Sequence, residues 1–70
     1  MNYYVYDNWR RNRGRTHRGD CPHCNEGMGK AGSRTGTHDE FLGPFDRECA
    51  FAKLAALGRK ERGPCLVCNP

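Results

Sequence analysis

Two pairs of cysteines with the same short spacing constrain the fold of this chain more than any other feature. Cys21 and Cys24 form the first pair, and Cys65 and Cys68 form the second pair near the end of the 70-residue sequence. Both sulfur atoms of a C-x-x-C pair can face one ion, and structural zinc sites hold their ion between four sulfur or nitrogen ligands. The sequence therefore predicts a fold that closes around one Zn²⁺ ion.

The small size of the chain also favours a stabilising metal ion. Only 36% of the residues are hydrophobic, and a domain of this length buries too little apolar surface to rely on its core alone. We expect a single zinc-binding domain over residues 1–70. Its expected apolar core consists of Tyr4, Tyr6, Trp9, Phe41, Leu42, Phe45, Phe51, Leu54 and Leu57.

The first residues of the chain bear on the chemical state of the cysteines. The segment MNYYVYDNWRRNR becomes polar within a few residues and lacks the apolar stretch of a signal peptide or a membrane span. We therefore expect a cytoplasmic protein without a membrane partner, whose thiols stay reduced. Cysteine pairs in such a protein favour a metal site over disulfides.

The fourth zinc ligand has two candidates. The favoured set is the four paired cysteines, because thiolates are the commoner ligands of structural zinc. His17 lies four residues before Cys21 and is the alternative ligand in place of Cys24. If Cys24 is the ligand, His17 is expected to hydrogen-bond a thiolate instead. His23, inside the first pair, is expected to be a solvated spacer.

The N-terminal segment is expected to form a basic hairpin. Residues 3–9 are aromatic and β-branched and predict a strand. A turn over 11–14 would return the chain along 15–18 and deliver His17 to the metal site. Five basic side chains lie on this hairpin and suit the phosphates of a nucleic acid: Arg10, Arg11, Arg13, Arg15 and Arg18.

The middle of the chain predicts a loop and a strand. Residues 25–40 are rich in glycine and have no apolar pattern, which predicts a flexible loop. The segment 40–45 predicts a short strand, in which Pro44 favours an edge position or the end of the strand at that residue. His38 is expected to lie on the surface.

A helix is expected after this strand. Asp46 is suited to cap its N-terminus, Glu48 lies in the first turn where the helix dipole favours an anion, and Gly58 is suited to end it. Its apolar face consists of Ala50, Phe51, Leu54 and Leu57, and we expect this face to pack against Phe41 and Phe45. The elements together predict a small zinc-stabilised α+β domain: hairpin, zinc knuckle, short strand, one helix and a second zinc knuckle. Cys49, on the helix, is expected to be an inert thiol.

The C-terminal sequence RECAFAKLAALGRKERGPCLVCNP resembles the end of the zinc-binding domain of the bacterial DNA-repair protein Ada. In that family an alanine-rich helix leads to a Pro-Cys-x-x-Cys-x-Pro end, which is matched here by Pro64, Cys65, Cys68 and Pro70. The upstream family motif Cys-Arg-x-x-Cys is matched by HRGDC, with His17 in the place of the first cysteine. The resemblance covers about residues 16–70 and is interrupted by the glycine-rich loop.

This resemblance implies a second ligand set and a role at DNA. By the family pattern the ligands would be His17, Cys21, Cys65 and Cys68, and Cys24 has no counterpart. The first cysteine of the family motif accepts a methyl group from DNA phosphotriesters. His17 offers no thiolate, so methyl transfer is not expected. The sequence is also similar to small bacterial zinc-knuckle proteins with the signature HR-x-x-C-x-x-C-N-x-G-x-G, which imply no particular activity.

These features predict a small structural-zinc module that binds DNA or RNA through its basic hairpin. The alternative is a zinc-stabilised module that binds a protein partner. We expect neither an enzyme nor a small-molecule substrate, because a zinc ion with four protein ligands has no open position. No carboxylate pair lies beside a nucleophile at a recognisable spacing either.

Overall fold

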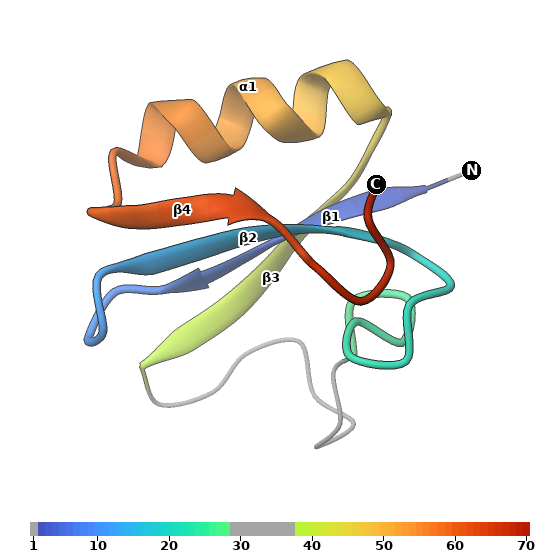
Figure 1. Ribbon diagram of the computed structural model, residues 1–70, viewed down its shortest axis with the longest axis horizontal. Coiled ribbons are helices and arrows are strands. Elements are labelled where there is room, and N and C mark those ends of the chain that lie inside the picture. Colours follow the sequence, from blue (N-terminus) through green and yellow to red (C-terminus); the bar gives the residue numbers. More distant parts are fainter. Residues whose placement is uncertain (1, 29–37) are drawn as a thin grey trace.

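The computed structural model describes residues 2–28 and 38–70. Within them the chain forms, in order, β1 (Tyr3–Asn8), β2 (Arg13–Arg18), β3 (Asp39–Phe45), α1 (Arg47–Leu57) and β4 (Glu61–Pro64). The strands make one sheet in the order β3-β1-β2-β4, and the helix covers one face of it (Figure 1). The predicted α+β class with a single helix is confirmed within the described residues.

The predicted N-terminal hairpin forms, but its turn covers residues 9–12 and not 11–14, because Arg13 and Gly14 already pair with β1. β1 and β2 are antiparallel, with Tyr3 opposite Arg18 and Asn8 opposite Arg13. The turn between them contains Asn12 with a positive φ of 55°, a conformation that asparagine tolerates better than most residues. β3 pairs with the other side of β1 and is an edge strand, as Pro44 indicates.

The strand β4 is absent from the sequence-based prediction. It pairs in parallel with β2, with Arg13 opposite Glu61 and Thr16 opposite Pro64. Its sequence, ERGP, has neither β-branched residues nor an alternating pattern. Its strand conformation therefore depends on pairing with β2 and not on its own residues.

The helix α1 has the predicted caps. The Asp46 side chain accepts a hydrogen bond from the Cys49 N–H (2.7 Å), and Glu48 lies in the first turn. Gly58 follows the last turn with a positive φ of 65° and donates its N–H to the Ala55 carbonyl oxygen. These local interactions fix both ends of the helix.

The apolar core lies between the helix and the sheet. Its buried members are Val5, Ala50 and Leu54, and the partly buried residues packed against them are Tyr3, Leu42, Phe45, Phe51 and Leu57. The predicted helix face is therefore the buried one. The expectation that Trp9 belongs to the core is wrong: its side chain is 41% exposed, because it follows the last residue of β1 and lies in the hairpin turn.

Phe41 packs on the opposite face of the sheet from the helix, which corrects the expected contact with α1. It pairs with Tyr6, and their ring centroids are 5.0 Å apart. The register of β1 with β3 shifts between Tyr3 and Val5. This irregularity places Leu42 and Phe45 together on the helix side, although regular alternation would separate them.

The predicted loop over 25–40 is only partly described. Residues 25–28 form turns, while Asp39 and Glu40 already belong to β3. The rest of this predicted loop, residues 29–37, lies outside the described residues. No helix within the described residues has the length and apolar character needed to cross a membrane.

Candidate metal centre

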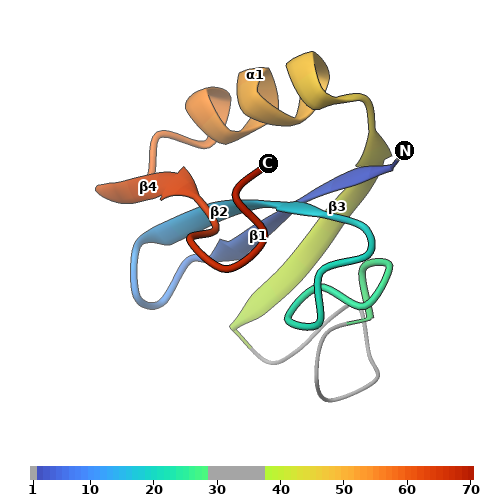
Figure 2. The same ribbon diagram turned by 45° about the vertical axis from the view of Figure 1, so that its right-hand side comes forward.

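The parallel pairing of β2 with β4 brings two distant segments to one end of the sheet. Thr16 is opposite Pro64 in the register, so the residues that follow them, His17 and Cys65, lie side by side. A hydrogen bond from the Cys65 N–H to the Thr16 carbonyl oxygen (2.9 Å) continues the pairing. Figures 1 and 2 show the C-terminal loop close to the turns that follow β2.

Four possible metal ligands converge at this end of the sheet. His17, Cys21, Cys65 and Cys68 each offer one ligand atom, and these atoms all lie within 4.8 Å of one another. We call these four residues the ligand cluster. A tetrahedral site with Zn–S distances of about 2.3 Å needs sulfur atoms about 3.8 Å apart, and the Cys21 and Cys65 Sγ atoms are 4.0 Å apart. The spacing therefore fits a zinc ion.

His17 has the environment of a metal ligand. Its side chain is 6% exposed, and its Nδ1 atom is buried without a hydrogen-bond partner among the residues that the structure describes. Burial lowers the pKa of His17 to about 4, and nearby His23 and Arg15 contribute in the same direction. The ring is therefore neutral at pH 7 and keeps a lone pair for a metal. A buried polar atom without a partner is costly, and a metal ion at Nδ1 would remove this cost.

The backbone around the ligand cluster donates N–H groups to sulfur. The Arg18 N–H donates to the Cys68 Sγ (3.3 Å). Burial opposes ionisation of Cys65, but hydrogen bonds from the backbone of Cys68 and Val67 outweigh it and lower the pKa of Cys65. Burial, together with the adjacent thiols of Cys21 and Cys65, raises the pKa of Cys68 to about 11. The backbone thus favours the thiolate of Cys65, while a metal must displace the proton of Cys68.

Cys24 lies outside the ligand cluster, although it is fully buried. Its Sγ accepts a hydrogen bond from the Gly27 N–H (3.3 Å), and it belongs to the same apolar cluster as Tyr4. Burial raises the pKa of Cys24 to about 11, so it stays a thiol at pH 7. The structure thus brings three of the four favoured cysteines together with the alternative ligand, His17.

Gly27 allows the turn after Cys24 to pass the Tyr4 ring. Its φ is +86°, and a Cβ atom at this position would lie 2.8 Å from Tyr4 Cε2. We expect Gly27→Ala to lower the free energy of unfolding of the metal-loaded protein by about 1–3 kcal/mol, because alanine strains this backbone and displaces the ring. Urea denaturation would measure the loss. Gly63→Ala is the control, since a Cβ there meets no atom of the described residues within 4 Å. Equal losses in both variants would contradict the prediction.

The remaining cysteine and two histidines are not part of the ligand cluster. Cys49 is exposed, and its hydrogen bond and charge contact with Asp46 raise its pKa. This effect opposes the helix dipole, which would favour a thiolate. His23 is half-buried, and His38 is exposed and directly precedes β3.

Three of the five hairpin arginines form ion pairs. Arg13 and Arg15 each bind one carboxylate oxygen of Glu61, at 3.2 and 2.9 Å. Arg18 binds Asp20 at 2.8 Å. Glu61 belongs to the unexpected strand β4 and neutralises part of the positive charge of the hairpin. The number of arginines in the hairpin sequence therefore overestimates how basic its surface is.

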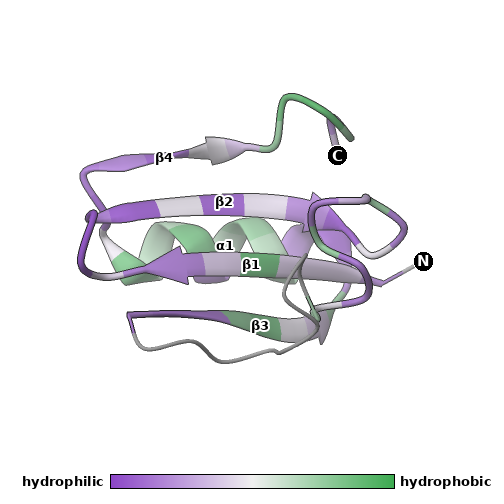
Figure 3. Cartoon of the chain, turned by 90° about the horizontal axis from the view of Figure 1, so that it is seen from below, coloured by the Kyte–Doolittle hydropathy of each residue, from purple (hydrophilic) through white to green (hydrophobic). Residues whose placement is uncertain are grey.

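The other two hairpin arginines lie in the exposed turn. Neither Arg10 nor Arg11 has an acidic group within ion-pair distance in the described part of the chain. They adjoin the sheet face opposite the helix, which carries the half-buried Tyr6 and Phe41. Figure 3 shows this face, with hydrophilic residues where β1 and β2 are joined.

Comparisons with protein-family models, with curated proteins and with solved structures found no match for this chain. The resemblance to the zinc-binding domain of Ada therefore stays a prediction from the motifs. The function is argued below from the geometry of the ligand cluster and of the hairpin.

Proposed function

We propose that this chain is a structural-zinc module in which the ion ties the end of β2 to the C-terminal loop. The convergence of His17 and three cysteines within 4.8 Å supports this proposal. Sulfur and imidazole ligands in a tetrahedral set favour Zn²⁺ over Mg²⁺ or Ca²⁺, which prefer oxygen. When bound, the ion would supply structure and not catalysis, because four protein ligands leave no position for water or substrate.

Metal analysis of the purified protein tests this proposal directly. One zinc ion per chain is expected, with all three cysteines of the ligand cluster protected from alkylation. A reduced chain that contains no metal and takes up neither Zn²⁺ nor Co²⁺ would refute the proposal.

We also propose that the hairpin surface of this module binds nucleic acid. Its support is the pair of turn arginines, which have no acidic partner in the described part of the chain, beside the sheet face opposite the helix, which carries the half-buried Tyr6 and Phe41. Guanidinium groups bind phosphates and release counterions, and aromatic rings stack on bases. Arg13 and Arg15 flank this surface but share Glu61, so the turn arginines are expected to contribute most.

A salt titration tests the nucleic-acid proposal. With two to four phosphate contacts, the slope of log K against log salt for a single strand is expected to be about −1.4 to −2.8. Fluorescence anisotropy of a labelled oligonucleotide would measure it with the zinc-loaded protein. An absence of binding to DNA and RNA at about 50 mM salt, where electrostatic binding is strong, would contradict the proposal.

A protein partner is the second candidate function. The loop between Cys65 and Cys68 presents Leu66, 90% exposed, and Val67, 63% exposed, and Figure 3 shows a hydrophobic loop after β4. This candidate is favoured if the zinc-loaded chain captures one defined protein and if Leu66→Ser with Val67→Ser abolishes capture. Under the nucleic-acid proposal the same double variant binds oligonucleotides normally.

A further inference from the structure

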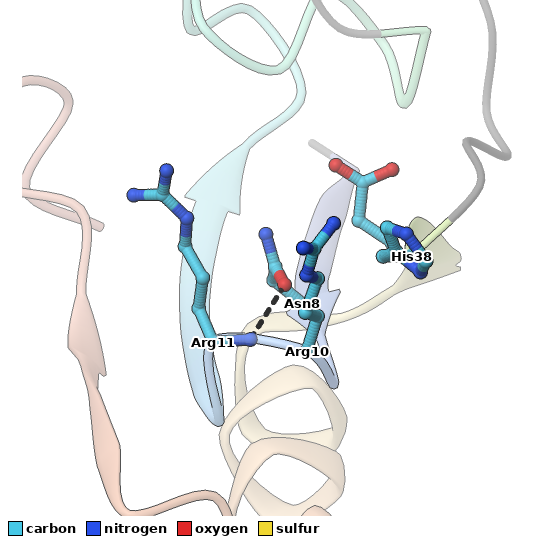
Figure 4. A pocket seen from close by; sticks show the side chains of 5 residues that line it. Asn8, Arg10, Arg11 and His38 are labelled. Carbon is cyan, nitrogen blue, oxygen red and sulfur yellow. Dashed lines mark hydrogen bonds between the residues drawn. The ribbon is translucent and has the colours of Figure 1, made fainter.

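A pocket lies between the hairpin turn and the start of β3. It is lined by Asn8, Arg10, Arg11, His38 and Asp39 and has a volume of about 590 Å³. This volume lies within the range of about 300–1,000 Å³ that is typical of small-molecule sites. Figure 4 shows Asn8 at the end of β1 and both arginines in the turn that follows, with His38 across from them.

A chain of hydrogen bonds holds the walls of this pocket in place. The Asn8 Oδ1 accepts from the Arg11 N–H (3.0 Å), and the Asn8 Nδ2 donates to the Tyr6 hydroxyl (3.2 Å). The Tyr6 hydroxyl in turn donates to the Asp39 Oδ2 (2.6 Å). The turn and the start of β3 are therefore linked through side chains, and Asp39 is oriented before any ligand arrives.

The charges of the pocket have opposite signs on its two sides. Arg10 and Arg11 bring two guanidinium groups from the turn, whereas Asp39 brings a carboxylate from β3. A simple phosphate would be attracted by the arginines and repelled by the carboxylate. A better ligand carries an anionic group at one end and hydrogen-bond donors at the other, as a nucleotide does with its phosphate and its amino or hydroxyl groups.

We propose that this pocket binds one nucleotide of a single-stranded nucleic acid. Arg10 and Arg11 bind its phosphate, and Asp39 accepts a hydrogen bond from an amino group of the base or a hydroxyl group of the sugar. A single strand fits because an unpaired nucleotide leaves its base edge free for contact. The inference rests on the proposed nucleic-acid function and assigns that function to a defined site.

The first test compares two pairs of charge-neutralising substitutions in the zinc-loaded chain. Binding of a labelled single strand of about 12 nucleotides is measured for Arg10→Gln/Arg11→Gln and for Lys53→Gln/Arg62→Gln, which removes the same charge outside the pocket. The pocket variant is expected to reduce the salt slope by about 0.7, the value for one lost phosphate contact on a single strand. The control is expected to retain most of the slope. Equal losses in the two variants would overturn the pocket while leaving the nucleic-acid function standing.

The second test asks whether Asp39→Asn weakens or strengthens binding of the single strand. Removing a negative charge strengthens binding to a phosphate by general electrostatics, so a site for phosphate alone predicts tighter binding by Asp39→Asn. We expect weaker binding instead, by about tenfold, the equivalent of one charge-assisted hydrogen bond. Glu40→Gln, the same charge change at a residue that does not line the pocket, is expected to bind like the wild type or slightly tighter. Tighter binding by Asp39→Asn would overturn the inference.

Two further outcomes have distinct meanings. A wild-type protein that binds no oligonucleotide removes the nucleic-acid function and this inference together. In the second outcome, a free mononucleotide displaces the strand at a concentration similar to that of the strand itself. This result would overturn the assignment to a strand and would show that the pocket binds free nucleotides. Unchanged zinc content in every variant shows that the losses do not come from unfolding, because the pocket residues are separate from the ligand cluster.

Discussion

Removal of zinc is expected to unfold this chain. Among the described residues, the core under the helix has three buried members, Val5, Ala50 and Leu54, and the second apolar cluster consists mainly of cysteines around Tyr4. Structural zinc contributes an apparent free energy of about 10–16 kcal/mol in small domains, as much as the whole stability of about 5–15 kcal/mol that is usual for a folded domain. Without the ion, the remaining interactions are expected to be insufficient.

Circular dichroism and ¹H–¹⁵N correlation spectra would record this transition. Excess chelator under reducing conditions is expected to collapse the amide dispersion, and stoichiometric Zn²⁺ is expected to restore it. Acid should act in the same direction, because the thiols must lose their protons to bind metal and burial holds the pKa of Cys68 at about 11. A metal-free chain with an unchanged spectrum would show that the ion is not needed for the fold.

The helix and the hairpin could be predicted because their signals are local. Asp46 and Gly58 fix the ends of α1 through contacts within a few residues, and aromatic and β-branched residues mark β1. The strand β4 could not be predicted in this way, because its conformation depends on pairing with β2, far away in the sequence. The side of the sheet on which Phe41 lies depends in the same way on a register shift between two strands.

Part of the metal site could likewise be predicted from local sequence, and part depends on contacts between distant segments. The C-x-x-C spacing identifies the two segments that meet, but it cannot distinguish a ligand from a packed thiol such as Cys24. The parallel register of β2 with β4 places His17 beside Cys65. This register cannot be predicted from the residues of either strand. The pocket at the hairpin turn was likewise missed, because Asp39 and His38 have no spacing relation to the arginines that they face.

Exchange of single candidate ligands is expected to separate His17 from Cys24 by their zinc affinities. His17→Ala removes one of four converging ligand atoms, so we expect it to weaken zinc binding by more than the roughly 10- to 100-fold that loss of an outer partner costs. Cys24→Ala removes a buried thiol that packs beside Tyr4, so we expect normal zinc stoichiometry and a loss of about 1 kcal/mol in stability. Competition with a chromophoric chelator would measure both affinities.

A third variant guards against general unfolding as the cause of zinc loss. His17→Cys replaces the imidazole by another zinc ligand and is expected to bind far more tightly than His17→Ala, which a merely structural role of the ring would not predict. The visible spectrum of the Co²⁺ form adds a direct readout, because thiolate-to-cobalt bands should strengthen in His17→Cys and stay unchanged in Cys24→Ala. The opposite pattern, with zinc lost in Cys24→Ala and kept in His17→Ala, would establish the four-cysteine set. Such a result would require the turns that follow β2 to rearrange on metal binding, since the Cys24 Sγ lies outside the group of ligand atoms within 4.8 Å of one another.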